Sequence, residues 1–355
     1  MTRSQLSEPT NIQQAIRHLV EGMHLEENEA AAAMSDIMAG VATPAQVAAF
    51  MTALRMKGET VEEITGCARV IREKAARIRP DVPVLVDTCG TGGDGANTFN
   101  ISTTAAFVVA GAGLPVAKHG NRSVSSRCGS ADVLEALGVR IDLEPHEVEA
   151  SIHEVGIGFL FAPTFHKAMR HAVGPRRELG VRTVFNLLGP LTNPAHADVQ
   201  VVGVYDRRLT TPLAQVLARL GVRTALVVHG LDRLDEISVS APTQISHVKN
   251  GEVITYTFSP EDVGLRIRPR QSIAGGDAVT NARITAKVLQ GAQGACRDVV
   301  LLNAAAAFYA AHLVDNLREG VRLAEEVIDS GRAWAKLEHL REFTNALPSR
   351  LKEAR

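Results

Sequence analysis

The sequence predicts an α/β protein, in which a small N-terminal helical domain accompanies a large domain with a mainly parallel central sheet covered by helices. Two observations lead to this fold class. Through about residue 78 the apolar residues recur at helical spacing, and no strand candidate precedes residue 84. Beyond that point short apolar runs alternate with helical stretches, which is typical of a parallel sheet with helices on both faces. With 355 residues, of which 45% are hydrophobic, the chain is long enough for both domains.

The N-terminal part is expected to consist of amphipathic helices. Two sets of apolar residues are each expected to keep one helix face, namely Ile12, Ile16, Leu19 and Met23, and then Val47, Met51 and Leu54. Two capping boxes mark helix starts, Thr43-Pro44-Ala45-Gln46 and Thr60-Val61-Glu62-Glu63. The segment from Pro80 to Pro83 is expected to be a hinge.

The second part should contain strands and helices in alternation. The expected strands are Val84–Asp87, Pro115–Lys118, Gly158–Ala162, Val199–Tyr205 and Ala225–His229. Asn250-Gly251 predicts an antiparallel hairpin between Ile245–Lys249 and Glu252–Phe258. Helices are expected at Leu213–Leu220, from Asp298 to Tyr309, and from Leu313 to about Phe343. The expected domains are residues 1–78 with roughly 170–195, and residues 79–169 with 196–355.

Composition excludes several classes of protein. The net charge of −1 gives no basic surplus for nucleic acid or an anionic membrane. The Ala-rich apolar runs are shorter than a membrane span requires, and the N-terminus lacks a secretory pattern. Four cysteines stand far apart, with no pair at metal-ligand spacing. We therefore expect a cytoplasmic protein that binds neither nucleic acid nor membrane.

A glycine-rich loop follows the first expected strand, at Gly90-Thr91-Gly92-Gly93-Asp94-Gly95. Glycines at a strand-to-helix turn let backbone N–H groups converge on an anion, and the following helix start at Asn100 to Thr103 favours phosphate. A plain packing turn is the alternative without a ligand. A dinucleotide site also fits the glycine spacing, but no acidic residue follows about 20 positions on, and Asp94 would repel a bare pyrophosphate. An acid at this place suits a metal or a ribose hydroxyl.

Two further segments are candidates for the same site. Lys118-His119-Gly120-Asn121-Arg122-Ser123-Val124-Ser125-Ser126 follows the second strand and offers two cations and three hydroxyls for diphosphate oxygens. Alone, it could be a solvated loop. Asp235-Glu236 follows a later strand, and an adjacent acidic pair is more often surface charge. If it faces the phosphates, it can hold Mg²⁺.

These motifs, together with Gly129-Ser130-Ala131-Asp132 and Val184-Phe185-Asn186 through Asn193-Pro194, resemble the anthranilate phosphoribosyltransferase family. This family is a member of the nucleoside phosphorylase-like (class III) phosphoribosyltransferases, and the resemblance covers almost the whole chain. It implies a homodimer formed by the helical domains and an active site at the hinge. It also implies transfer of 5-phosphoribose from phosphoribosyl pyrophosphate to the amino group of anthranilate, with Mg²⁺ as cofactor, in tryptophan biosynthesis. The sequence does not decide whether anthranilate synthase is a partner.

The resemblance assigns site residues. For phosphoribosyl pyrophosphate they are Gly90, Gly93, Asp94, Thr98, Asn100, Ile101, Ser102, Thr103, Lys118, His119, Gly120, Asn121, Arg122, Ser123, Val124, Ser125, Ser126 and Ser130. For anthranilate they are Gly90, Asn121 and Arg176, with Arg177 as the neighbouring alternative. For Mg²⁺ they are Ser102, Asp235 and Glu236. Lys118 and Arg176 are the expected catalytic residues.

One departure from the family pattern is Arg233, which stands where the family often has a small residue. It is expected either to pair with Asp232 or to weaken metal binding. Two other functions stay open from the sequence. A pyrimidine nucleoside phosphorylase-like enzyme shares the expected fold, although the acidic pair and the Lys-His-Gly-Asn segment argue against it. A family-like nucleic-acid-binding protein is opposed by the near-neutral charge.

Overall fold

A computed structural model describes residues 9–123 and 127–347 of the chain. The chain divides into two compact units, here called the helical unit (Met1–Ala75 and His166–Thr192) and the α/β unit (Ala76–Phe165 and Asn193–Arg355). The sequence placed the boundaries at about 78, 170 and 195. In the part of the chain that is described, no helix is long and apolar enough to cross a membrane.

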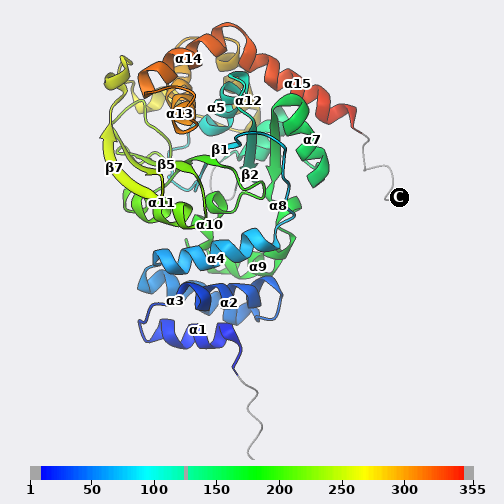
Figure 1. The fold of residues 1–355 in the computed structure, drawn as a ribbon, viewed down its shortest axis with the longest axis vertical. Coiled ribbons are helices and arrows are strands. Elements are labelled where there is room, and N and C mark those ends of the chain that lie inside the picture. Colours follow the sequence, from blue (N-terminus) through cyan, green and yellow to red (C-terminus); the bar gives the residue numbers. More distant parts are fainter. Residues whose placement is uncertain (1–8, 124–126, 348–355) are drawn as a thin grey trace, which may run out of the picture. The chain divides into compact units, whose positions relative to one another are not determined.

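The helical unit consists of short amphipathic helices (Figure 1). They are α1 (Asn11–Val20), α2 (Glu27–Met38), α3 (Pro44–Lys57), α4 (Val61–Lys74), η1 (Lys167–Met169), α9 (Arg170–Leu179) and α10 (Phe185–Leu191). Both expected capping boxes are formed, because the Thr43 and Thr60 hydroxyls accept from the backbone N–H groups of Gln46 and Glu63. Met23 was wrongly expected on a buried face: α1 ends at Val20, and Met23 is exposed.

The α/β unit contains a seven-stranded sheet in the order β3-β2-β1-β4-β5-β6-β7. Its strands are β1 (Val86–Gly90), β2 (Val116–Gly120), β3 (Ile157–Phe161), β4 (Val199–Gly203), β5 (Thr224–Gly230), β6 (Thr243–Lys249) and β7 (Glu252–Phe258). The first five in sequence are parallel, and β6 and β7 form the antiparallel hairpin at Asn250-Gly251. The expected strands are thus confirmed, with ends that shift by up to three residues.

Helices cover the sheet (Figure 1). They are α5 (Ile101–Gly111), α6 (Ser130–Ala136), α7 (Pro145–Val155), α8 (Ala162–Phe165), η2 (Arg207–Leu209), α11 (Thr210–Arg219), η3 (Pro260–Val263), η4 (Arg270–Ile273), α12 (Ala278–Leu289), α13 (Ala295–Ala310), α14 (Leu317–Asp329) and α15 (Arg332–Ala346). A single helix from Leu313 to about Phe343 was wrong. The chain breaks after α14 at Gly331, whose φ of 76° is left-handed and ends a helix.

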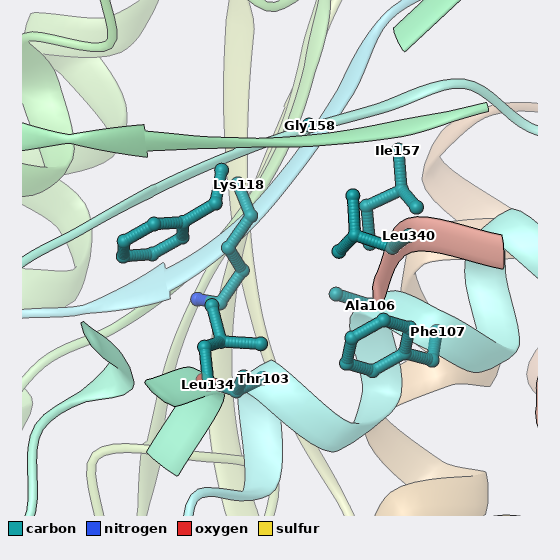
Figure 2. A pocket seen from close by; sticks show the side chains of 9 residues that line it. Thr103, Ala106, Phe107, Lys118, Leu134, Ile157, Gly158 and Leu340 are labelled. Carbon is teal, nitrogen blue, oxygen red and sulfur yellow. The ribbon is translucent and has the colours of Figure 1, made fainter. Parts of the chain in front are cut away.

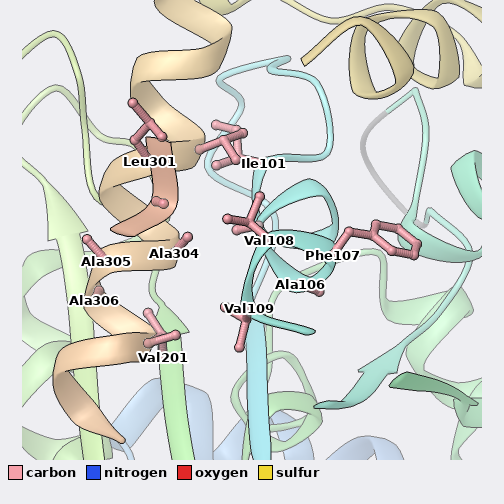
Figure 3. Close-up of a cluster of buried hydrophobic side chains, with 14 of the residues drawn as sticks. Ile101, Ala106, Phe107, Val108, Val109, Val201, Leu301, Ala304, Ala305 and Ala306 are labelled. Atoms are coloured by element: carbon pink, nitrogen blue, oxygen red, sulfur yellow. The ribbon is translucent and has the colours of Figure 1, made fainter. Parts of the chain in front are cut away.

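The main core lies between the sheet and the two most buried helices, α5 and α13. Small side chains let these helices approach each other closely, and Ala304 of α13 points toward Val108 of α5 (Figure 3). Because nearly every side chain of α5 is buried, its N-terminal end is held firmly at the sheet edge where β1 ends. This fixed helix start is one wall of the candidate site.

Candidate functional site

The candidate site lies at the carboxyl ends of β1 and β4. The strand order runs from β1 to β2 and β3 on one side, and from β4 to β5 on the other, so the order reverses between β1 and β4. In open α/β sheets, ligands bind outside the carboxyl ends of the strands at such a reversal. The glycine loop leaves β1 at Gly90, beside the last residue of β4, Gly203.

The segment that carries Asp235 crosses directly over these two strand ends. A Cβ atom on Gly203 would lie 1.6 Å from the Asp235 carbonyl oxygen, and one on Gly90 would lie 2.9 Å from Asp235 Oδ2. The backbone N–H of Gly92 donates to Asp235 Oδ2 at 2.8 Å. Glycine at positions 90 and 203 is therefore required for the acidic segment to reach the loop.

Three carboxylates meet at this crossing. Asp94 Oδ2 accepts from the backbone N–H of Asp235 at 3.3 Å, and Glu236 is the next residue. Burial, and then the nearby charges of Asp94 and Glu236, raise the pKa of Asp235 well above its ordinary range, against the Gly92 N–H that lowers it. The Asp235 carboxylate thus contacts the glycine loop, and the neighbouring Glu236 side chain is buried.

Glu236 contacts the start of α5. Its Oε1 accepts from the backbone N–H of Ser102 at 3.1 Å, and the Ser102 hydroxyl also hydrogen-bonds this carboxylate. The Thr88 hydroxyl of β1 donates to the Ser102 carbonyl at 2.9 Å, which fixes Ser102 over the strand. The structure therefore brings together the three residues that the resemblance assigns to Mg²⁺, namely Ser102, Asp235 and Glu236.

Lys118 is the cation of the site. Its side chain is 4% exposed and runs beside a small cavity lined by Thr103, Leu134 and other mostly apolar side chains (Figure 2). The ammonium donates to the Thr88 carbonyl, and its charge lowers the pKa values of Asp87 and Glu236, against the larger raising effect of burial on each. A buried lysine is stabilised here by the opposite charges of Asp87 and Glu236.

Asp87 and Asn193 form a buried hydrogen-bonded pair beside the strand that carries Lys118, and the sequence interpretation missed both as site residues. The Asn193 amide donates to Asp87 Oδ2 and to the Ala117 carbonyl, each at 2.8 Å. The backbone N–H of His119 donates to Asp87 Oδ1 at 3.3 Å. A carboxylate inside an otherwise apolar strand was the signal that could have revealed Asp87, because buried charges require partners.

The loop after β2 is folded against α6. Asn121 N–H donates to Ser130 Oγ at 3.2 Å, and Asp132 Oδ2 accepts from the N–H groups of Ser123 and Gly129 at 3.1 and 2.8 Å. Arg122 pairs with Asp132 at 3.0 Å and with Glu135 at 2.5 Å. Val124, Ser125 and Ser126 lie outside the described residues.

Four other expected contacts have contrasting exposure. The side chains of Ile101, Thr103 and His119 are buried, so a ligand would meet Ile101 and Thr103 through their backbone. Thr98 is half-buried and forms an isolated antiparallel bridge with Ala274.

The backbone at Gly92 and Gly93 is left-handed, with φ of 64° and 77°, which keeps the loop of Gly90 to Asp94 tightly turned.

A divalent cation fits this donor set. Asp94, Asp235 and Glu236 lie close together, and their mutual repulsion would be relieved by added positive charge. Among the described residues, no group of three or more His, Cys, Asp or Glu is arranged to hold a metal alone. Mg²⁺ does not require such a cage, because it binds through one or two carboxylates together with substrate phosphates and water.

Arg176 belongs to the helical unit, on α9. Its guanidinium lies 5.3 Å from the centre of the Phe185 ring, and burial lowers its pKa. No ion pair of Arg176 with a carboxylate is recorded within residues 9–123 and 127–347. Arg177, by contrast, is exposed. The stacked, partly desolvated guanidinium is the better prepared of the two for a carboxylate ligand.

Arg233 occupies a turn that suits glycine. Its φ is 72°, its N–H donates to the Gly230 carbonyl at 2.8 Å, and its side chain is exposed. An expected pairing with Asp232 is not formed in the part of the chain that is described, because the Asp232 carboxylate accepts from the hydroxyls of Ser238 and Ser240. Glycine would adopt this left-handed backbone with less strain than arginine does.

Comparison with known proteins gives the family. Residues 13–75 match the glycosyl transferase family helical bundle domain, and residues 82–334 match the glycosyl transferase family a/b domain. The anthranilate phosphoribosyltransferase of Symbiobacterium thermophilum is 63% identical over 332 residues, which cover 94% of this chain and 97% of that protein. The chain belongs to the anthranilate phosphoribosyltransferase family.

Solved anthranilate phosphoribosyltransferases share the fold. The crystal structure of the Thermus thermophilus enzyme has a TM-score of 0.89 and 46% identity, and covers 93% of this chain and 99% of that chain. The Saccharomyces cerevisiae enzyme in complex with PRPP and Mg has a TM-score of 0.87 and 30% identity, with 97% and 100% covered. The chain is accordingly a pentosyltransferase of tryptophan biosynthesis, and its reaction joins 5-phosphoribose to the amino group of anthranilate.

The raised pKa of Glu236 predicts that the stability of the protein depends on pH. Burial raises this pKa from 4.5 to about 7, against the lowering effects of Lys118 and Ser102. Between these values the folded state holds the proton more tightly than the unfolded state does, so rising pH weakens the fold. The free energy of unfolding falls by up to about 3 kcal/mol, and the fall is complete above the pKa of Glu236 in the folded state.

We expect Glu236→Gln to remove this slope. Without metal, the free energy of unfolding of the variant, relative to that of the wild type, should be larger at about pH 8 than at about pH 5. Urea unfolding at both pH values measures the difference. A difference that stays constant with pH would contradict the assignment.

Proposed function

We propose that the α/β unit binds phosphoribosyl pyrophosphate as its Mg²⁺ complex, with Asp235 and Glu236 toward the metal. The observation that carries the proposal is the meeting of Asp235 with the glycine loop, where Gly92 N–H contacts its carboxylate and Gly90 and Gly203 leave room for it. This arrangement places acids beside an anion-binding loop, which is favourable only with a cation between them. The yeast relative in complex with PRPP and Mg supports the same ligand pair.

The remaining assigned residues complete the proposed diphosphate and ribose contacts. Around the glycine loop they are Gly90, Gly93, Asp94, Thr98 and Asn100 to Thr103, and after β2 they are Lys118 to Ser126 and Ser130. Arg122 must then exchange Asp132 and Glu135 for phosphate oxygens, an exchange between charged partners on an exposed side chain.

The chemistry follows from charge development. The amine lone pair of anthranilate forms a bond to ribose C1 while the electrons of the C1–O bond leave with pyrophosphate, and the nitrogen then loses a proton. The departing group gains negative charge, and Lys118 together with loop N–H groups stabilises it. Bound Mg²⁺ would supply further Lewis-acid stabilisation of the same oxygens. The aryl amine is already neutral, so no protein base is required for attack.

Anthranilate is proposed to contact Gly90, Asn121 and Arg176. Guanidinium matches carboxylate in a two-pronged geometry, and the Phe185 ring already orients the guanidinium of Arg176. We expect Arg176→Ala to raise KM for anthranilate by about tenfold to a hundredfold, with KM for phosphoribosyl pyrophosphate nearly unchanged. Steady-state kinetics in both substrates measures this. Arg177→Ala is the matched control, and an equal rise in that variant would move the role to Arg177.

The helical unit is proposed to form a homodimer interface. Its exposed apolar side chains support this assignment, and they include Val20, Val41, Met56, Val173 and Val181. A cytoplasmic location is proposed from the resemblance and from the sequence pattern. Sedimentation at several protein concentrations tests the dimer.

The reaction itself is tested by anthranilate fluorescence. The proposal predicts that fluorescence falls with time only when phosphoribosyl pyrophosphate and Mg²⁺ are both present, and that pyrophosphate appears in equal amount. Phosphorolysis of thymidine or uridine without anthranilate turnover would instead favour the nucleoside phosphorylase alternative.

A further inference from the structure

Asn281 is a buried polar residue in the first turn of α12 and is not among the residues assigned to the site. Its side chain is 1% exposed. The amide oxygen accepts from the backbone N–H of Gly276 at 2.7 Å, and the amide nitrogen donates to Asn100 Oδ1 at 2.9 Å. Asn100 in turn donates from Nδ2 to the Cys128 carbonyl at 3.2 Å. These bonds connect α12 to both loops of the candidate site.

The direction of this chain of hydrogen bonds is fixed at both ends. Gly276 N–H can only donate, so the oxygen of the Asn281 amide must face it and the nitrogen must face Asn100. Asn100 then presents its oxygen to Asn281 and its nitrogen to Cys128, whose carbonyl can only accept. Asn281 therefore sets which way the Asn100 amide points.

Asn100 does not act as an ordinary helix cap. It precedes α5 at the N-cap position, but its side chain makes no cap hydrogen bond. The side chain instead reaches the segment just before Gly129 and Ser130, at the end of the second loop. Asn100 thus joins the start of α5 to that loop, and Asn281 holds Asn100 in the orientation that does so.

The backbone around Asn281 is anchored to the same loop. Gly275 N–H donates to the Asn97 carbonyl at 2.8 Å, and Phe99 N–H donates to the Ile273 carbonyl at 3.4 Å. A Cβ on Gly275 would lie 2.5 Å from Phe99 N, so the two segments are in direct contact. The segment whose Gly276 N–H donates to Asn281 is therefore bonded directly to the loop that carries Asn100.

We propose that Asn281 is a positioning residue for phosphoribosyl pyrophosphate, which keeps the glycine loop and the loop after β2 in register through Asn100. It touches neither substrate. The inference rests on the proposed function, because both loops are assigned to that ligand. Loss of the orientation should weaken binding of phosphoribosyl pyrophosphate more than binding of anthranilate, because the proposed carboxylate ligand Arg176 lies outside both loops.

The sharpest variant is Asn281→Asp. The carboxylate keeps an acceptor for Gly276 but cannot donate to Asn100, so the Asn100 amide turns and presents its oxygen to the Cys128 carbonyl. An acid in the first turn of α12 is compatible with the helix. We expect KM for phosphoribosyl pyrophosphate to rise about tenfold, as for one lost buried hydrogen bond, and KM for anthranilate to rise by less.

Thr285→Val is the matched control, on the same helix and equally buried. Thr285 shares a hydrogen bond of 2.9 Å with Thr104 of α5, so its loss tests a general loosening of the α12–α5 contact. We expect comparable loss of stability from urea unfolding and an unchanged KM for phosphoribosyl pyrophosphate. The double variant Asn281→Ala with Asn100→Ala should lose less binding free energy for phosphoribosyl pyrophosphate than the sum of the losses in the two single variants. Both substitutions break the same chain of hydrogen bonds.

Two results would overturn the proposal: an unchanged KM for phosphoribosyl pyrophosphate in Asn281→Asp, or an equal rise in Thr285→Val. Additive effects of Asn281→Ala and Asn100→Ala would also contradict it. Failure of the proposed function is separate and visible in the wild type, which would then consume no anthranilate with Mg²⁺ and phosphoribosyl pyrophosphate.

Discussion

Replacing Lys118 by methionine is expected to lower kcat/KM for phosphoribosyl pyrophosphate by about a thousandfold. Lys118 is the buried ammonium at the site, and methionine fills similar space without charge or donors. Loss of one preorganised electrostatic group of this kind costs about 3–4 kcal/mol in the transition state. KM for anthranilate should change far less, because Lys118 is assigned to the leaving group.

The same variant should lose stability in a pH-dependent way. At about pH 8 the charges of Asp87 and Glu236 are left without their cation, which costs up to about 3–5 kcal/mol for a broken buried pair. Burial raises the pKa of Glu236 to about 7, so protonation of Glu236 relieves part of this cost near pH 5. Lys336→Met is the control. Lys336 lies on α15, away from the site, and its ammonium also donates to a backbone carbonyl, that of Val155. Comparable activity in Lys118→Met and Lys336→Met would refute the assignment.

The double variant Asp235→Asn with Glu236→Gln is expected to increase the Mg²⁺ requirement of activity and to raise the stability of the metal-free protein. Amides keep the shape of the crossing segment but remove two charges from the cluster with Asp94. The Mg²⁺ concentration for half-maximal activity should rise by about a hundredfold, since two anionic ligands are lost. The metal-free protein should become more stable at about pH 8, because like-charge repulsion disappears.

The control is the acidic pair Glu325 and Glu326 on α14, changed to Gln in the same way. It should alter neither Mg²⁺ dependence nor the pH profile of stability. Activity assays across Mg²⁺ concentrations and thermal unfolding without metal provide both measurements. An unchanged Mg²⁺ titration in the Asp235 and Glu236 double variant would remove these residues from the metal site.

The sheet could be predicted from sequence because its pattern is local. The buried parallel strands are short apolar runs between helical stretches, and Asn250-Gly251 marks the hairpin by its turn chemistry. The C-terminal helices were merged into one because apolar spacing continues through residues 317–346. The break depends on the left-handed Gly331, and a glycine inside a helical pattern does not by itself reveal that conformation.

The site was predictable in its ingredients but less so in its contacts. The glycine loop, the Lys118 segment and the acidic pair were all identified, since their residue types suit a metal and diphosphate. Gly203 was not, because its role is to admit the backbone of Asp235, 32 positions later in the sequence. Asn193 and Asn281 were missed for the same reason, since a buried amide acquires its partners only through the tertiary fold.

The most direct test of the account is a crystal structure with phosphoribosyl pyrophosphate and with Mn²⁺ in place of Mg²⁺. Anomalous scattering locates the manganese. The account predicts a manganese peak in contact with a carboxylate of Asp235 or Glu236 and with a diphosphate oxygen, above the ends of β1 and β4. Diphosphate bound at another edge of the sheet, or a metal peak away from both acids, would contradict it.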